Sequence, residues 1–223
     1  MDTTSPTDVV TAILREIRSL DPPNTPNLRR IRLRFTRLLR DSSATDLFKV
    51  SQALLKSEVP RWVAYELLQN HDSAFQKLGA SRLRELGDGM EGWHWVDGFA
   101  RVLSGPAWLR GQISDRQIER WAHSHNLWWR RAALVSTVAL NTKSDGGQGD
   151  SPRTLKICRL LVADHNDMIV KALSWALRSL VGYDPGAVKR FLADHEDIVA
   201  SRAKREVCNK LITGRKNPRI QRQ

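Results

Sequence analysis

The chain has 223 residues, enough for one large domain and too few for two average domains with linkers. It carries 36 Lys and Arg against 24 Asp and Glu, a formal net charge of +12, and 26 of the 36 cations are Arg. This excess excludes an acidic solvating tail and indicates a polyanionic partner such as nucleic acid. No apolar run is long enough to span a bilayer, and the first residues lack the basic and then apolar order of a secretory signal. We therefore expect a cytoplasmic protein that does not bind a membrane.

Metal, nucleotide and nucleophile motifs are missing from the sequence. Cys158 and Cys208 are too few for a disulfide framework and lack the paired spacing of a zinc site. His123 and His125 resemble a ligand pair, but no third ligand follows at metal spacing. There is also no Gly-rich phosphate loop and no serine nucleophile elbow. We expect no metal and no nucleotide cofactor.

Helix signals recur along the whole chain, whereas strand signals are nearly absent. Expected helix starts are Ser5-Pro6, Thr25-Pro26, a capping box from Ser114 to Gln117, and Ser151-Pro152. Expected helix ends are Gly87, Gly105, Gly182 and Gly214. This spacing predicts an all-α protein with about twelve helices of roughly 10–18 residues.

The helices are short and show no heptad pattern, which favours stacked helix pairs over a four-helix bundle. Two loosely similar segments begin at Trp128 and at Lys171, and their first tryptophans, Trp128 and Trp175, are 47 positions apart. HEAT-type helical repeats have a period of about 40–47 residues. We expect a single repeat domain over residues 1–213 with a concave face. The Gly-rich segment 142–150 is expected to be a flexible loop, and the basic segment 214–223 a disordered tail.

Basic residues are concentrated in two places. Residues 29–40 hold six arginines and no acid, and helical spacing puts Arg30, Arg34 and Arg37 on one face. The core side of the same helix is expected to consist of Ile31, Phe35 and Leu38. From Arg202 to the end there are eight basic residues and one acid. Each cluster alone fits a solvated face, but together they predict phosphate contacts on both sides of a groove, with Arg30 and Arg34 among them.

Three helices each pair an indole with a charge beside their core stripe. In the helix around 91–103 the core stripe is Val96, Phe99 and Leu103, and the neighbouring stripe is Trp93, Asp97 and Arg101. In the helix around 166–182 the core stripe is Val170, Leu173, Leu177 and Leu180, and the neighbouring stripe is Lys171, Trp175 and Arg178. The helix after Asn126 places Trp128 one turn from Arg131. These stripes predict a shared cavity. The alternatives are that the indoles belong to the core and that Asp97 and Arg101 form a surface ion pair.

Five motifs in a fixed order point to one family. They are Thr25-Pro26 followed by Arg29-Arg30, Trp93-x-x-x-Asp97, Asn126-Leu127-Trp128-x-x-Arg131, Lys171-Ala172-x-x-Trp175-x-Leu177-Arg178, and Lys204-Arg205-Glu206. In this order the chain resembles the bacterial AlkD-like DNA alkylation repair glycosylases, which have HEAT-like repeats, from about Thr25 to Leu211.

The resemblance implies a right-handed all-helical superhelix whose basic concave face holds double-stranded DNA. It implies hydrolysis of the N-glycosidic bond of cationic alkylated purines, such as 3-methyladenine and 7-methylguanine, without flipping the base into a pocket. In that case Trp93, Asp97 and Trp175 would contact the deoxyribose of the lesion, and Arg131 and Arg178 would hold the DNA backbone. We expect Lys171 and Trp128 to add DNA contacts, and the protein to act as a monomer on DNA in the bacterial cytoplasm.

The residues fit this chemistry. An N-alkylated purine is already a good leaving group, so the reaction mainly needs stabilisation of the oxocarbenium-like sugar, which an ionised Asp97 and two indole faces provide. Two other functions stay open at this point. One is a non-catalytic DNA-binding HEAT module, and the other is a protein-binding helical scaffold, which predicts a groove of mixed charge.

Overall fold

The computed structural model of the protein describes residues 5–218, and over this range it is all-α, with helices α1–α14, one π-helical segment, one 3-10 turn and no strand. The α-helices are 5 to 14 residues long, so several are shorter than expected. The chain divides into two compact units, residues 1–89 and 90–223. The single domain expected over residues 1–213 stays a prediction. No helix within 5–218 is both long and apolar enough to cross a membrane.

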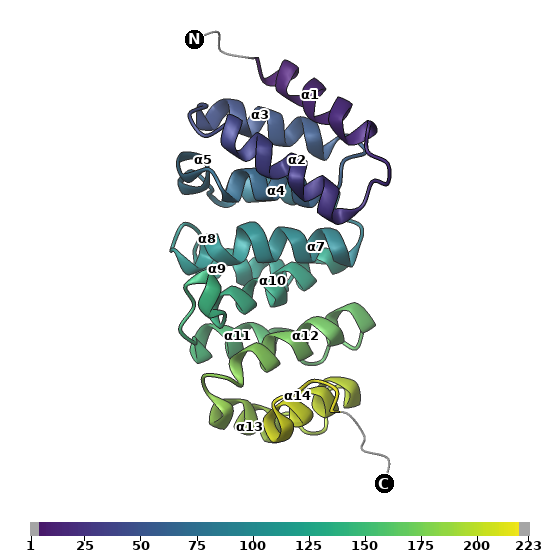
Figure 1. Ribbon diagram of the computed structural model, residues 1–223. Coiled ribbons are helices and arrows are strands. Elements are labelled where there is room, and N and C mark those ends of the chain that lie inside the picture. The colour runs from purple at the N-terminus through teal and green to yellow at the C-terminus, as the bar shows by residue number, and fades with distance from the viewer. Residues whose placement is uncertain (1–4, 219–223) are drawn as a thin grey trace. The chain divides into compact units, whose positions relative to one another are not determined.

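Over residues 5–89, the first unit contains six helices. They are α1 (Pro6–Arg18), α2 (Thr25–Leu38), α3 (Ala44–Leu55), α4 (Arg61–Gln69), α5 (Asp72–Gln76) and α6 (Ala80–Gly87). Helix α3 packs against α1 and α4, and α2 packs against the same two helices (Figure 1). The core between them is aliphatic and aromatic, with Ile13, Leu47 and Leu68 almost fully buried.

In the part of the second unit that the structure describes, residues 90–218, there are eight α-helices. They are α7 (Trp93–Phe99), α8 (Gly105–Leu109), α9 (Asp115–Ala122), α10 (Leu127–Leu140), α11 (Ser151–Leu161), α12 (Asp167–Leu180), α13 (Pro185–Asp194) and α14 (Ser201–Thr213). Helix α10 packs against α7, α8, α9, α11 and α12, and every residue from 131 to 140 is buried. Helices α10, α12 and α14 lie one beside the next, because α12 packs against both of the others (Figure 1).

The helix starts agree with the sequence, but two caps lie one residue earlier than expected. The Ser5 hydroxyl accepts a hydrogen bond from the Asp8 amide at 3.2 Å, as predicted. Before α2 and α11, however, the caps are Asn24 and Asp150, whose side chains accept from amides three residues on. Proline therefore occupies the second helical position in both helices, where its missing N–H costs nothing. Ser114 precedes α9 but makes no side-chain cap bond.

The expected helix end at Gly105 is wrong. The chain continues from α7 through a π-helical segment, η1 (Ala100–Ser104), into α8, and the Gly105 amide donates to the Ala100 carbonyl. A Cβ at Gly105 would lie 2.8 Å from the backbone oxygens of both Ala100 and Ser136. Glycine is needed here because the backbone approaches α10 closely, and not because a turn begins. Gly214, in contrast, ends α14 with a left-handed φ of 71°, as predicted.

The core side of α2 differs from the prediction at one position. Ile31 and Phe35 are buried, but Leu38 is 66% exposed, and Leu39 is buried in its place. The reason is geometric, since Leu39 lies four residues after Phe35 and Leu38 lies about 100° away around the helix.

Segment 142–150, expected to be flexible, is fixed to the second unit at several points. It contains a 3-10 turn, η2 (Lys143–Asp145), and Asp145 forms an ion pair with Arg101 at 2.6 Å. The Gly149 amide donates to the Leu140 carbonyl, and the Tyr183 hydroxyl donates to the Gly147 carbonyl. These bonds make the segment a packed connection between α10 and α11.

The expected disordered tail begins at Gly214, and its first residues contact α14. The Lys216 carbonyl accepts a hydrogen bond from the Asn209 side chain at 3.0 Å, and the Lys216 ammonium lies 3.3 Å from Glu206. Over residues 214–218 the chain is therefore attached to the preceding helix. The remainder of the expected tail, residues 219–223, lies outside the described residues.

Candidate functional site

The three helices expected to share a site, α7, α10 and α12, are in contact in the second unit. Both α7 and α12 pack against α10. The predicted core stripes are confirmed, since Val96, Phe99, Leu103, Val170, Leu173, Leu177 and Leu180 are all buried. The charged and aromatic stripes therefore lie at the edges of this packing, where the sequence placed them.

Asp97 and Arg131 form the centre of this arrangement. The Arg131 Nε donates to Asp97 Oδ1, and its Nη2 donates to Oδ2, each at 2.8 Å. The third nitrogen, Nη1, donates to the Met168 carbonyl at the start of α12, at 2.5 Å. One guanidinium thus joins α7, α10 and α12. The two parallel bonds fix the plane of the carboxylate, which a single-point contact would leave free to rotate.

The burial of Arg131 does not fit the backbone contact that the resemblance implied. Its side chain is 6% exposed, compared with 17% for that of Asp97. All of its described hydrogen bonds point into the unit, so it presents almost no surface to a phosphate. In this structure the guanidinium holds Asp97. The spacing within each helix gave no signal for this role, because the two residues are 34 positions apart.

The alternative of an Asp97–Arg101 surface ion pair is wrong. Arg101 pairs with Asp145 of the segment between α10 and α11, while Asp97 pairs with Arg131. Both oxygens of Asp97 are therefore directed by a residue of another helix.

Five tryptophans of this unit fall into two groups. Trp108 and Trp121 are core residues, 1% and 5% exposed, as the alternative of structural indoles predicts. Trp93 is 55% exposed at the start of α7, one turn before Asp97. Trp128 and Trp175 are half-buried at the first turn of α10 and in the middle of α12. An indole that leaves more than half of its surface in water, as Trp93 does, indicates a contact surface for a partner.

Trp175 is linked to the ion pair through its helix. It lies seven residues after Met168, whose carbonyl Arg131 contacts, and seven residues are two turns of α12. The structure thus joins Asp97 and Arg131 directly. Trp93 lies on α7 and Trp175 on α12, two of the three helices that Arg131 joins.

Lys171 and Arg178 flank Trp175 on α12, and both have partners. The Lys171 ammonium lies 2.6 Å from Asp167, one turn earlier. The Arg178 Nε donates to the hydroxyl of Ser174 at 3.1 Å. Burial lowers the pKa of Arg178, and the nearby negative charge of Glu206 opposes this shift. Each cation is held in place while part of its surface stays accessible.

The predicted DNA contacts of the first unit lie on α2. Arg30 is exposed and has no partner within residues 5–218, and the same holds for Arg37. Arg34 pairs with Glu16 of α1, and its side chain remains 54% exposed. Arg32, which the sequence grouped with the others, forms an ion pair with Glu66 of α4 at 2.7 Å and is largely buried. The cluster therefore contains cations that face solvent and one, Arg32, that is largely buried against another helix.

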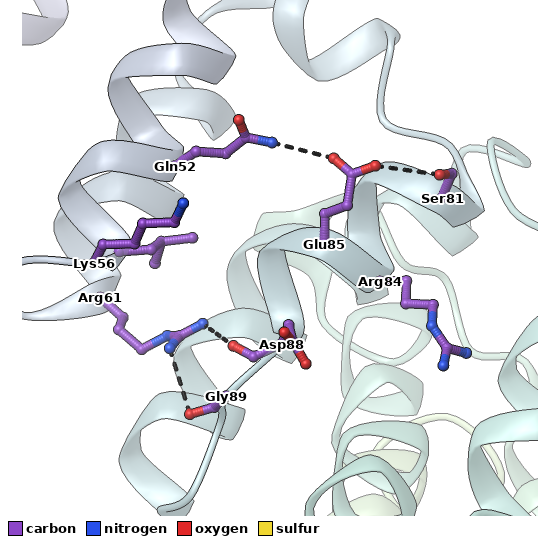
Figure 2. Close-up of a pocket in the computed structure, with 9 residues that line it drawn as sticks. Gln52, Lys56, Arg61, Ser81, Arg84, Glu85, Asp88 and Gly89 are labelled. Carbon is purple, nitrogen blue, oxygen red and sulfur yellow. Dashed lines mark hydrogen bonds between the residues drawn. The ribbon is translucent and has the colours of Figure 1, made fainter. Parts of the chain in front are cut away.

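A polar cavity of about 770 Å³ was not expected from the sequence and lies within the first unit. In Figure 2, Arg61 points to the carbonyls of Asp88 and Gly89, and Gln52 points to Glu85. These contacts hold the end of α6 against α3 and α4. Its lining contains none of the predicted site residues and consists of Gln52, Leu55, Lys56, Arg61, Ser81, Arg84, Glu85, Asp88 and Gly89.

The residues that the structure describes include no group of three or more His, Cys, Asp and Glu side chains placed to hold a metal ion. Cys158 is fully buried, and burial raises the pKa of its thiol far above the ordinary value. A thiol that stays protonated is a poor nucleophile.

Comparison with known proteins identifies the family. A family model described as DNA alkylation repair enzyme matches residues 23–211, which is most of the chain. Comparisons with curated proteins and with solved structures gave no significant match. The match includes all the helices that carry Asp97, Arg131 and Trp175. The chain therefore belongs to the DNA alkylation repair enzyme family.

Proposed function

We propose that the protein is an alkylpurine DNA glycosylase that hydrolyses the N-glycosidic bond of cationic purines, such as 3-methyladenine and 7-methylguanine, in duplex DNA. One observation carries the proposal. In a chain of this repair family, the Asp97 carboxylate accepts two hydrogen bonds from the buried Arg131. Asp97 also lies one helical turn after Trp93, which is 55% exposed.

The role of Asp97 follows from the charge that develops in the reaction. As the cationic base leaves, positive charge moves onto the sugar, and a preorganised carboxylate stabilises it without reorganising. Arg131 neutralises part of the carboxylate charge, which weakens this field, but it also fixes the direction of the lone pairs. A carboxylate oxygen that accepts one hydrogen bond still has a lone pair for the proton of an attacking water.

Trp93 and Trp175 supply the walls of the proposed site. The face of an indole is electron-rich and attracts positive charge within about 6 Å. Trp93 is already exposed on the surface, so a lesion can contact it without entering an enclosed pocket. This supports a reaction in which the base is not flipped into the protein.

Duplex DNA is the proposed partner of the basic surfaces. We propose that the stacked helices form a right-handed superhelix of HEAT-like repeats with a basic concave face, and the side-by-side packing of α10, α12 and α14 supports this. The DNA backbone would be contacted by four cations and one indole, namely Arg30, Arg34, Lys171, Arg178 and Trp128. Arg131 instead positions Asp97.

The proposal is tested by release of 7-methylguanine from alkylated duplex DNA by the wild type and by Asp97→Asn. The amide keeps the size of the carboxylate but removes its charge, so we expect the rate to fall about 100-fold or more. Asp115→Asn is the matched control. Asp115 accepts a hydrogen bond from the Trp108 indole, and this change should leave the rate within twofold of the wild type.

Equal rates for the wild type and Asp97→Asn would remove Asp97 from the mechanism. A second function, non-catalytic DNA binding, is favoured by the fact that both oxygens of Asp97 already accept hydrogen bonds from Arg131. The same experiment separates the two functions. A protein that binds duplex DNA in a salt-dependent way but releases no base would be a non-catalytic DNA-binding module.

A further inference from the structure

A second buried carboxylate, Glu206 of α14, takes no part in the chemistry proposed above. It is 4% exposed, and a carboxylate removed from water needs strong partners. Its Oε2 accepts a hydrogen bond from the Ser174 hydroxyl at 2.6 Å, and its Oε1 lies 3.2 Å from Arg202 and 3.3 Å from Lys216. Burial raises the pKa of Glu206, but Ser174 and the two cations outweigh burial and lower it.

Ser174 connects this carboxylate to the proposed site. It is fully buried on α12, so it cannot touch DNA in this structure. A hydroxyl has one proton to donate, and the proton of Ser174 goes to Glu206. The oxygen therefore turns its lone pairs toward the Arg178 Nε, which donates to it at 3.1 Å.

Arg178 has a free side once its Nε is engaged. The guanidinium is partly exposed, and its two Nη atoms have no partner within residues 5–218. They form the edge that binds a phosphate through two N–H groups. Because Ser174 holds the opposite edge, the side chain loses little freedom when it binds an anion.

We propose that Ser174 and Glu206 are positioning residues for Arg178, and that together they orient its Nη edge toward a DNA phosphate next to the lesion. The inference rests on the proposed function, because it assigns the anion to the duplex. Ser174 holds Arg178 directly, and Glu206 acts through Ser174.

A purely structural link between α12 and α14 is the competing explanation, and a double-mutant cycle separates the two. The variants are Ser174→Ala, Arg178→Ala and the double variant, each assayed for affinity to an undamaged duplex and for release of 7-methylguanine. Ser136→Ala is the matched control. Ser136 is also fully buried, and its hydroxyl bonds to the Ala132 carbonyl and the Ser104 hydroxyl and, within residues 5–218, to no arginine.

We expect Ser174→Ala to weaken duplex affinity and base release about fivefold, and Arg178→Ala to weaken both by about tenfold. The double variant should match Arg178→Ala, because Ser174 acts only through that side chain. Glu206→Gln keeps an oxygen acceptor and should give the same pattern with a smaller effect. Ser136→Ala should change neither quantity.

An effect of Ser174→Ala no larger than that of Ser136→Ala would overturn the inference, as would losses that add fully in the double variant. Failure of the proposed function gives a different result. If the wild type releases no 7-methylguanine, that function is wrong, and the affinity cycle still decides whether Ser174 positions Arg178.

Discussion

Two arginines of α2, Arg30 and Arg37, and two of the second unit, Arg131 and Arg178, carry the same charge but differ in what holds their side chains. On α2, Arg30 and Arg37 extend into solvent without a partner among the described residues. In the second unit, Arg131 is held by Asp97, and Arg178 is held by Ser174. An exposed, mobile cation attracts a polyanion at long range and is screened by salt, whereas a held guanidinium acts through its direction. The number of arginines in a segment therefore does not reveal which of the two roles they have.

The largest effect should follow removal of the held arginine of α10. Arg131→Met leaves the Asp97 carboxylate and the Met168 carbonyl without their donor, and we expect the free energy of unfolding to fall by about 3 kcal/mol. Arg101→Met breaks a single ion pair, with Asp145, so we expect a smaller cost of about 1–2 kcal/mol. Urea unfolding of both variants measures the difference, and equal losses would contradict the central position given to Arg131.

A similar contrast should exist inside α2. Arg32→Ala breaks the ion pair with Glu66, so we expect it to lower the free energy of unfolding by about 2 kcal/mol. The salt dependence of duplex binding should be unchanged in this variant. If Arg32→Ala changes that dependence as much as Arg30→Ala does, then Arg32 belongs to the DNA-binding cations and the division of α2 is wrong.

Arg30→Ala and Arg37→Ala should do the opposite. Each removes an exposed cation, so the free energy of unfolding should stay within about 0.5 kcal/mol of the wild type. If each contacts one phosphate, the slope of log affinity against log salt should fall by about 0.9 per variant. Titration of a duplex at several salt concentrations measures the slope, and an unchanged slope would place these cations away from DNA.

Glu206 gives the smallest effect, and it depends on pH. Its folded-state pKa lies below the ordinary value of 4.5, so its contribution to stability is complete above that pH. The contribution is lost as the pH falls through the lowered pKa. Glu206→Gln has no such group, so the stability difference between it and the wild type should shrink between pH 6 and pH 3. A difference that grows on acidification would contradict the paired, ionised state of Glu206.

Helical periodicity predicted the buried stripes of α7 and α12 correctly because burial repeats with the turn of the helix. It placed Phe99, Leu177 and their neighbours in the core, and it left Trp93 and Trp175 outside. It failed at Gly105, where the same residue type serves close packing against α10 instead of a turn. The local sequence pattern contains no information about how closely the backbone at Gly105 approaches α10.

Partners that are far apart in the sequence could not be predicted in the same way. Arg131 reaches Asp97 across 34 positions, and Ser174 reaches Glu206 across 32. The family motifs contained three of these four positions, all but Ser174. They did not show which of these residues would be bonded to each other. Arg131 and Arg178 each lie three positions after a tryptophan. Tertiary packing decides that Arg131 turns inward, whereas Arg178 keeps its Nη edge free.

The most direct test of the account compares a cationic lesion with a neutral one, because the proposed chemistry uses no acid to protonate the leaving base. Under single-turnover conditions the wild type should release 7-methylguanine from a duplex at least about 100-fold faster than it releases 1,N6-ethenoadenine from a matched duplex. Release of both bases at the same rate would contradict the claim that Asp97 assists the departure of a base that is already charged.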